Sequence, residues 1–231
     1  MQHSNDKSYQ FLFIKVIRII TLGLLLHSAT STALTLHEDE FDDWVIMPEC
    51  YELGNSKCEG LCPGYYMEPE YPHPDKEKPD SEFPLEITSN KSRFVSKGTS
   101  TFTSNVISKQ GNKSMFSDTM DIIHNENSGD LEKIHAEGHV IITEPGIRID
   151  GTEADHYEKT DIRIVKDAKF RIYENHARGT SPELKTEAGT LMYLPKSTYT
   201  TCMPKTNAWS LKSKKTKLNK ESGRGEAWHS K

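Results

Sequence analysis

An all-β, mostly antiparallel stack is the fold class that this sequence predicts for residues 85–231. Three observations predict it. Short apolar segments alternate with charged residues at a period of two, as half-buried strands require. Turn signals rich in glycine, asparagine and proline separate these segments. One stretch of the sequence also recurs at a fixed spacing, which is typical of stacked β units.

Residues 1–33 are predicted to form a secretory signal peptide. Lys7, Lys15 and Arg18 precede an apolar run at 19–26, and small residues follow up to Ser-Thr-Ala at 31–33. A basic region, a short apolar core and small residues before the cleavage point characterise such signals. The alternatives are a buried first helix and an uncleaved anchor, although the run is shorter than the about 20 residues that span a bilayer. Export places the mature chain in an oxidising compartment.

Two segments lie between the signal and the β block. Residues 34–66 form a cysteine-bearing segment, with an acidic stretch at 37–43. Residues 67–84 contain five prolines and many charged residues. Such a composition forms neither ladder nor helix hydrogen bonds and has little apolar surface to bury. We therefore expect residues 67–84 to be an extended linker that leads into a β domain at 85–231.

The β domain is predicted from its apolar segments. Strands are expected at 94–107, 140–142, 147–149, 162–165, 170–173 and 191–194. Residues 106–121 also align without gaps on residues 140–155, an offset of 34. No window between 85 and 231 has the 3.6-residue stripe of an amphipathic helix.

Alternate residues of these strands predict one apolar interior between two facing sheets. The residues expected to line it are Val106, Met120, Val140, Ile142, Ile147, Ile149, Ile164, Phe170, Ile172, Leu191 and Tyr193. Closed tightly, such an interior is a sandwich core. Opened like a V, it is a trough that holds acyl chains, at about 0.8 kcal/mol for each buried methylene. The residues alone favour the core.

Four cysteines, Cys50, Cys58, Cys62 and Cys202, predict disulfides in an exported chain. Cys50 and Cys58 can pair with each other, or one of them with Cys62. Cys202 is then free, joined to Cys62, or bonded to a partner chain. The Cys-x7-Cys-x3-Cys spacing does not match the usual paired zinc ligands, so we expect no metal.

Several function classes are disfavoured by the sequence. No nucleophile elbow, zinc-protease helix motif or phosphate-binding loop is present, so we expect neither an enzyme nor a cofactor. The net charge of −5 carries no nucleic-acid signature. Residues 205–231 are basic but lack regular aromatic interleaving, so no nucleic-acid partner is expected.

Five motifs together point to a known family. They are Cys-Pro-Gly-Tyr-Tyr-Met-Glu-Pro (62–69), His-Ala-Arg-Gly (176–179), Ser-Thr-Tyr-Thr-Thr-Cys-Met-Pro (197–204), Trp-Ser-Leu (209–211) and Gly-Arg-Gly-Glu-Ala-Trp (223–228). Their order and spacing resemble the N-terminal periplasmic, OstA-like domain of the LptD family of lipopolysaccharide (LPS) assembly proteins. The resemblance covers about residues 44–231, and its strongest element is the block around Cys202.

The resemblance implies an open antiparallel β-jellyroll, the "β-taco" shared with LptA and LptC, and favours the trough over the core. It implies transport of LPS at the outer membrane, with the interior guiding lipid A acyl chains toward a barrel. The implied partners are LPS, an LptA-like periplasmic bridge protein bound by edge-strand pairing, a separately encoded LptD barrel, and LptE. The implied location is the periplasm, in association with the outer membrane of a Gram-negative cell.

The sequence also departs from the family pattern. A barrel follows the domain in the family, whereas this chain stops at Lys231, so we expect a truncated LptD-like protein that does not insert LPS by itself. Cys62 and Cys202 match family cysteines that bridge to a pair near the end of that barrel, while Cys50 and Cys58 match none. The alternatives are a secreted β-solenoid that binds or processes polysaccharide, whose clustered aromatic residues are not seen here, and a degraded gene remnant.

Overall fold

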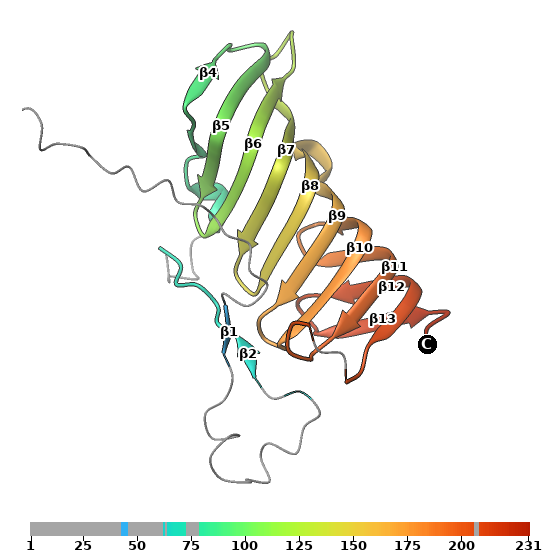
Figure 1. The fold of residues 1–231 in the computed structure, drawn as a ribbon. Helices are drawn as coiled ribbons and strands as arrows, with labels where there is room; N and C mark the ends of the chain where they lie inside the picture. The colour runs from blue at the N-terminus through green and yellow to red at the C-terminus, as the bar shows by residue number, and fades with distance from the viewer. Residues whose placement is uncertain (1–42, 46–61, 63, 73–78, 206–207) are drawn as a thin grey trace, which may run out of the picture. The chain divides into compact units, whose positions relative to one another are not determined.

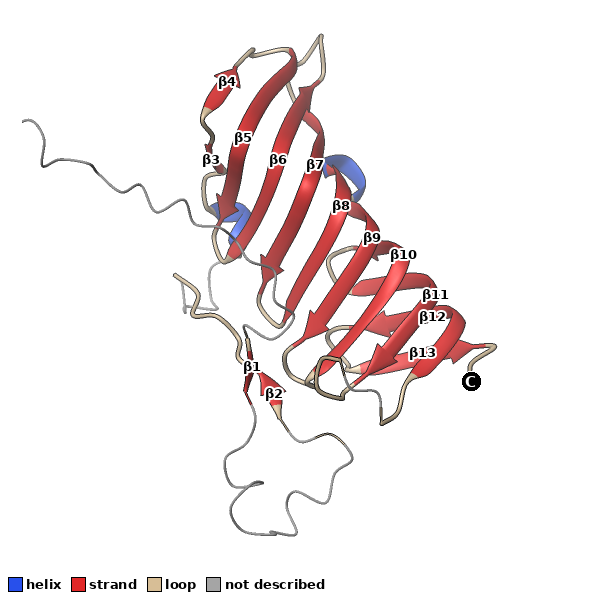
Figure 2. Cartoon of the chain, viewed as in Figure 1, coloured by secondary structure: helices blue, strands red, loops and turns tan. Residues whose placement is uncertain are grey.

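The computed structural model describes residues 43–45, 62, 64–72, 79–205 and 208–231. The chain divides into two units, Met1–Asp39 and Glu40–Lys231, and every described residue belongs to the second. This unit is dominated by one 11-stranded sheet (Figure 1). Its described helical elements are 3-10 turns at Asp80–Glu82 and Glu158–Thr160 (Figure 2). In the described residues, no helix has the length and apolar character needed to cross a membrane.

The strands of the large sheet form an antiparallel meander, which confirms the predicted fold class. They are β3 (Glu86–Thr88), β4 (Lys91–Arg93), β5 (Gly98–Gln110), β6 (Lys113–His124), β7 (Leu131–Glu144), β8 (Ile147–Tyr157), β9 (Ile162–Ile172), β10 (Ala177–Glu187), β11 (Leu191–Thr200), β12 (Leu211–Asn219) and β13 (Arg224–Trp228). From β5 to β13 each strand pairs with its neighbour in the chain, while β3 and β4 both pair with β5. A separate two-stranded sheet joins β1 (Trp44–Val45) and β2 (Tyr65–Tyr66).

The 34-residue repeat corresponds to a repeated β-hairpin. The turn between β5 and β6 and the turn between β7 and β8 are 34 residues apart. The residues with positive φ in the middle of β5, Ser104 and Asn105, have counterparts at Gly138 and His139 in β7. The repeat therefore preserves an irregularity of the backbone as well as the positions of the strands.

A line of irregularities crosses the middle of the sheet. Asp167 in β9 and Lys196 in β11 also have positive φ, at 49° and 45°. The register shifts between β5 and β6 and between β7 and β8 at the corresponding positions, which marks β-bulges. A bulge bends its strand and increases the local twist. Bulges in alternate strands bend the sheet along its length, so that the start of β9 comes close to the end of β7.

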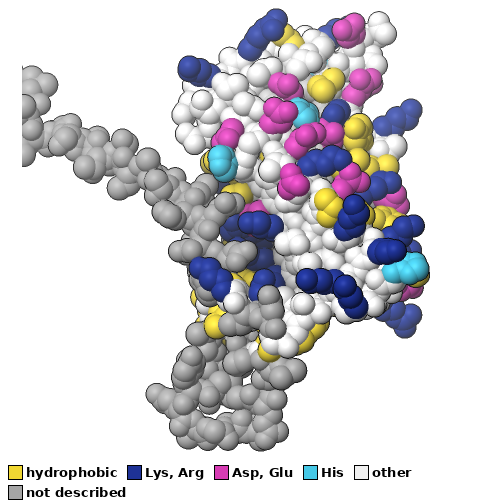
Figure 3. Space-filling view, turned by 45° about the vertical axis from the view of Figure 1, so that its right-hand side comes forward, with side chains coloured by type: hydrophobic (Ala, Val, Ile, Leu, Met, Phe, Trp, Pro, Cys, Tyr) yellow, Lys and Arg dark blue, Asp and Glu magenta, His cyan; other side chains and the backbone are white. Residues whose placement is uncertain are grey.

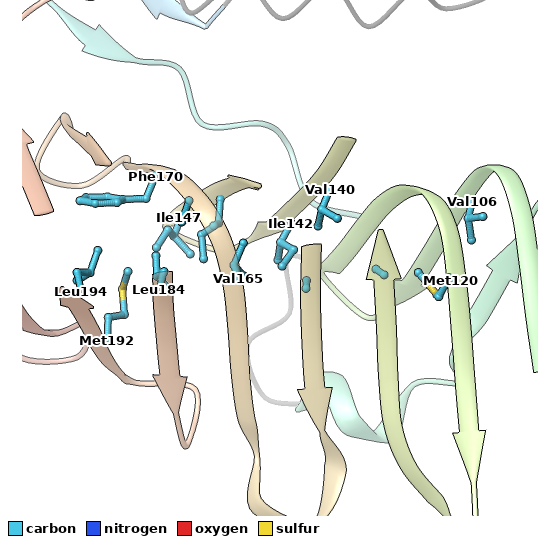
Figure 4. Packing of buried hydrophobic residues seen from close by; sticks show 14 of the residues in the cluster. Val106, Met120, Val140, Ile142, Ile147, Val165, Phe170, Leu184, Met192 and Leu194 are labelled. Atoms are coloured by element: carbon cyan, nitrogen blue, oxygen red, sulfur yellow. The ribbon is translucent and has the colours of Figure 1, made fainter. Parts of the chain in front are cut away.

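The concave side of the bent sheet encloses the main hydrophobic cluster, shown in Figure 4 as a row of side chains that runs from one strand to the next. Its members are Val106, Met120, Ile122, Ala136, Val140, Ile142, Ile147, Ile149, Ala154, Val165, Ala168, Phe170, Leu184, Met192 and Leu194. All are at most 4% exposed, so the interior is densely packed. We call this side of the sheet the inner face and the other side the outer face.

Three residues predicted to line the interior lie on the outer face. Ile164 pairs with Asp155 and Lys185, and the bulge at Asp167 explains the error, because it shifts the alternation between Val165 and Phe170 by one residue.

Leu191 and Tyr193 were predicted to face the interior for another reason. Both faces of this strand segment carry apolar side chains, and the structure buries Met192 and Leu194 instead. Tyr193 lies beneath the ammonium of Lys217 on the outer face.

A second, smaller cluster joins the N-terminal segment to the sheet. Trp44 and Tyr66 pack with Tyr173 of the turn after β9, and the rings of Trp44 and Tyr66 meet edge to face at 4.8 Å. A disulfide links Cys62 to Cys202, with their Cα atoms 4.5 Å apart, which selects one of the predicted pairings. Cys50 and Cys58 lie outside the described residues.

Candidate functional site

The inner face provides an apolar surface that runs across most of the large sheet. The cluster begins at Val106 in β5 and continues to Leu194 in β11. Small hydroxyl side chains accompany it toward the later strands, where the hydroxyls of Ser197, Ser213 and Thr216 lie 2.5–3.0 Å from one another. These hydroxyls satisfy each other's hydrogen bonds, so they leave no unsatisfied polar group on the surface at this point.

A cavity of about 430 Å³ continues this surface at the end of the sheet. Ile147 and Met192 belong both to the buried cluster and to the cavity wall, while Ile172 and Leu218 complete its apolar side. The rest of the wall comes from β11, β12 and β13 and from the turns after β7, β9 and β12. The cavity is therefore an end of the interior that side chains leave unfilled.

An ion triad lies across the bent sheet. The Glu144 carboxylate accepts a hydrogen bond from Arg163 Nη1, and Lys220 Nζ lies 3.3 Å from its second oxygen. These three side chains are 8%, 19% and 22% exposed, respectively. We call Glu144, Arg163 and Lys220 the clasp.

The clasp joins opposite ends of the strands. Glu144 ends β7 and pairs with Ile147, which in turn pairs with the last residue of β9, Ile172. Arg163 is the second residue of β9, about 30 Å from Ile172 along a straight strand. Contact between Glu144 and Arg163 therefore requires the bend produced by the bulges. Lys220 reaches the same carboxylate from the end of β12, where its N–H donates to the carbonyl of Thr190.

Electrostatics favour the charged form of Glu144. Burial alone would raise the pKa of this carboxyl, but the cations of Arg163 and Lys220 outweigh it and lower the pKa to about 2. Beside Arg163, burial lowers the pKa of His156, and the guanidinium adds to this effect. The clasp is thus an ionised, partly desolvated group at neutral pH.

Two polar side chains flank Arg163 on the inner face. Arg163 pairs with His156 of β8 and with Thr186 of β10. Thr186 is 6% exposed, and its hydroxyl makes no hydrogen bond with any described residue. The Nδ1 atom of His156 is also buried without a partner in the described part of the chain. The interior therefore holds unused hydrogen-bonding groups beside a cation.

The N-terminal segment braces the hairpin that carries Glu144. The Tyr71 hydroxyl donates to the Glu144 carbonyl at 3.0 Å, and the Gly146 N–H donates to Glu68 Oε1 at 2.6 Å. Farther along, Arg171 binds both carboxylate oxygens of Asp43 at 2.6–2.7 Å. The segment is thus tied to the turn after β7 as well as to Cys202.

The outer face is polar, and Figure 3 shows side chains of both charges spread over the side in view. His135, Glu153 and Asp155 form its best candidate for a metal site, with ligand atoms within 4.8 Å of each other. The ammonium of Lys133, however, lies 2.7 Å from Asp155 Oδ1 and supplies a positive charge there. Burial lowers the pKa of His135, but its hydrogen bond to Asp155 outweighs this and raises the pKa overall. An internal ion network accounts for this cluster.

The structure places most of the predicted interior residues together. Val106, Met120, Val140, Ile142, Ile147, Ile149 and Phe170 belong to the buried cluster, and Ile172 packs against it partly exposed. Sequence reasoning missed the clasp, because its members are separated by 19 and 57 residues of charged sequence with no shared motif. The local signal that could have found Arg163 is its position two residues before Val165, which places both side chains on the same face of the strand.

One family model matches part of the sequence of the large sheet. Residues 86–190 match the family model described as "LptA/(LptD N-terminal domain) LPS transport protein". This description is of a transport protein, in agreement with the prediction that the chain is not an enzyme.

The chain is also similar to curated proteins named "LPS-assembly protein LptD". It is 28% identical over 207 residues to that of Pseudomonas putida (strain GB-1), which covers 88% of this chain and 22% of the relative. It is 29% identical over 186 residues to that of Pseudomonas entomophila (strain L48), covering 80% and 19%. The chain thus spans about a fifth of the length of these relatives.

One solved structure with a similar chain is LptH, titled the LptA-homologous periplasmic component of the lipopolysaccharide transport device from Pseudomonas aeruginosa. The alignment has a TM-score of 0.42 and 14% sequence identity, and it covers 47% of this chain and 78% of that one.

Proposed function

We propose that this chain, whose residues 86–190 match the LptA/LptD N-terminal family model, conducts LPS along the inner face of its bent sheet. The observation that carries the proposal is the unbroken apolar cluster from β5 to β11, which ends in a partly apolar cavity. Acyl chains gain about 0.8 kcal/mol for each methylene that they bury. Because apolar contacts are not directional, bound chains can also move along such a surface.

Entry of acyl chains requires the interior to open. The cluster side chains are at most 4% exposed, so LPS would have to part the two halves of the sheet or displace side chains. The cavity beside β12 and β13 favours opening at the later strands, since space is already present there. The interior would then act as a closed core when empty and as a trough when loaded.

The proposed partners follow from the edges of the sheet. The outermost strand at one end is β13, and all five of its residues are exposed. Short strands β3 and β4 form the other end. Exposed edges bind further strands by backbone hydrogen bonding. We therefore propose an LptA-like bridge protein at one edge and a barrel-bearing LptD partner with LptE at the other, in the periplasm next to the outer membrane.

Site-specific photocrosslinking tests the proposal. A photoreactive phenylalanine analogue at Ile149, on the inner face, is expected to capture LPS in cells. The same analogue at Ile164 is the matched control, because this isoleucine lies on the outer face of the neighbouring strand. Equal capture at the two positions, or none at either, would overturn the proposed function.

A further inference from the structure

We propose that Arg163 and Lys220 bind the phosphate groups of the LPS headgroup, and that Glu144 occupies this phosphate site until the lipid arrives. The inference rests on the proposed function and adds a headgroup site to it. Its basis is the position of the clasp at the border between the apolar interior and solvent, together with two buried atoms beside Arg163, Thr186 Oγ1 and His156 Nδ1, that have no hydrogen-bond partner among the described residues.

Position is the first argument. Lys220 lines the terminal cavity together with apolar residues, among them Ile147, Ile172 and Leu218. Arg224 lies in the same wall, as do the carboxylate residues Glu174 and Glu226. Cations that border an apolar cavity match an amphiphile whose anionic head lies beside its acyl chains. A purely structural ion pair would gain nothing from this placement.

Charge is the second argument. One carboxylate faces two cations in the clasp, which leaves an excess of positive charge at the site. A phosphate monoester carries about −1.5 to −2 charges at pH 7 and offers three strong acceptor oxygens. Arginine binds phosphate in a two-pronged geometry that its planar guanidinium favours. Phosphate can therefore satisfy both cations more completely than Glu144 does.

Unused hydrogen-bonding capacity is the third argument. The Thr186 hydroxyl neighbours Arg163 on β10 and is buried without a hydrogen-bond partner among the described residues. A buried polar group without a hydrogen-bond partner lowers the stability of the folded protein. Such a group is expected where a ligand supplies the missing partner, and a phosphate oxygen beside Arg163 would accept a hydrogen bond from this hydroxyl.

Exchange of ligands at the clasp would also couple headgroup binding to opening. Glu144 ties the end of β7 to the start of β9 and to the end of β12. When phosphate replaces the carboxylate on Arg163 and Lys220, this tie between opposite strand ends is released. The β7–β8 turn stays held from outside by Tyr71 and Glu68. Arrival of the headgroup thus frees the interior for its own acyl chains.

The test measures binding of LPS and of enzymatically dephosphorylated LPS to the purified full chain with its disulfide intact. The informative variants are Thr186→Val, Lys220→Gln, Arg163→Gln with Lys220→Gln, and Glu144→Gln. Lys185→Gln is the matched control, since Lys185 pairs with Glu187 on the outer face at 2.6 Å. Thermal unfolding of every variant identifies those that fold.

The wild type is expected to bind intact LPS more tightly than the dephosphorylated form. Loss of both cations should weaken binding of intact LPS about tenfold or more, and Lys220→Gln alone by several fold. Thr186→Val should weaken it several fold without loss of stability, a result that a structural role does not produce. Glu144→Gln should strengthen it, and Lys185→Gln should change nothing.

The outcomes separate the two proposals. If the wild type binds neither form of LPS, the proposed function fails. If it binds both forms equally, and if Thr186→Val and Lys220→Gln fold and bind like wild type, the headgroup site is wrong while the apolar conduit stands. Should the double variant not fold, these two single variants decide the question by themselves.

Discussion

At the scale of single residues, the His-Ala-Arg-Gly motif has a structural explanation. Ala177 is completely buried, and Arg178 donates to the carbonyls of Cys202 and Met203. A Cβ atom on Gly179 would lie 2.1 Å from the Thr198 carbonyl oxygen and 2.4 Å from Cζ of Phe170. The glycine is therefore required by the close approach of β11 and by the ring that fills the interior beneath it.

Gly179→Ala is expected to destabilise the protein by about 2–3 kcal/mol, because the added methyl group overpacks the site against backbone. Urea unfolding followed by circular dichroism measures the change. The control is Thr180→Ala at the next position, which removes an exposed hydroxyl that bonds Thr198 Oγ1 and should cost no more than about 1 kcal/mol. Similar stability of the two variants would contradict the packing argument.

At the scale of elements, the N-terminal segment acts as an external brace. It is fixed to the turn after β7 through Glu68 and Tyr71, and to the loop after β11 through the Cys62–Cys202 disulfide. These anchor points are far apart in the sequence, and the disulfide alone closes a separation of 140 residues. The brace thus connects the hairpin that carries Glu144 to the later strands.

Cys202→Ser is expected to lower the free energy of unfolding by about 2–4 kcal/mol, since a long closed loop restricts the unfolded chain. It should also release the segment, so that protease cleavage within residues 67–84 becomes faster. Wild type treated with a reductant serves as the control and should behave like the variant. Unchanged cleavage would mean that the aromatic cluster around Trp44 holds the segment without the disulfide.

At the scale of the whole molecule, the clasp joins strand ends that lie far apart along the bent sheet. The bulges bend the strands, but Glu144 is the described group that ties the two ends of the bent strands together by charge. Its pKa is lowered to about 2, so the ionised form is favoured in the folded state. A depressed pKa contributes stability above the unfolded value of 4.5, and this contribution disappears as the pH falls toward 2.

Between pH 4.5 and 2, the free energy of unfolding of the wild type should therefore fall by up to ~3 kcal/mol. Glu144→Gln lacks this contribution at every pH. Urea unfolding of both proteins at pH 7, 4.5, 3 and 2 measures the difference, which is expected to shrink as the solution is acidified. Glu183→Gln is the control, because Glu183 pairs with Lys166 on the outer face and should matter by less than about 1 kcal/mol. A constant difference between wild type and Glu144→Gln would refute a charged clasp.

Local patterns in the sequence determined the class of fold and much of the interior. Period-two alternation depends only on neighbouring residues, so β5, β7, β8, β9 and β11 were predicted in part. Strand β10 was missed, because Leu184 is its only large apolar residue and its place in the sheet depends on hydrogen bonds to β9 and β11. Strand β6 was seen in the repeat but was not identified as a strand.

Only the tertiary structure decided the rest. The bulge at Asp167 moved Ile164 to the outer face, because one extra residue reverses the alternation and its location depends on the neighbouring strands. Pairing of Cys62 with Cys202 and contact of Glu144 with Arg163 depend on how distant segments meet once the sheet is bent. Periodicity along the chain determines which residues form strands, but the geometry of the bent sheet determines which charges and thiols become neighbours.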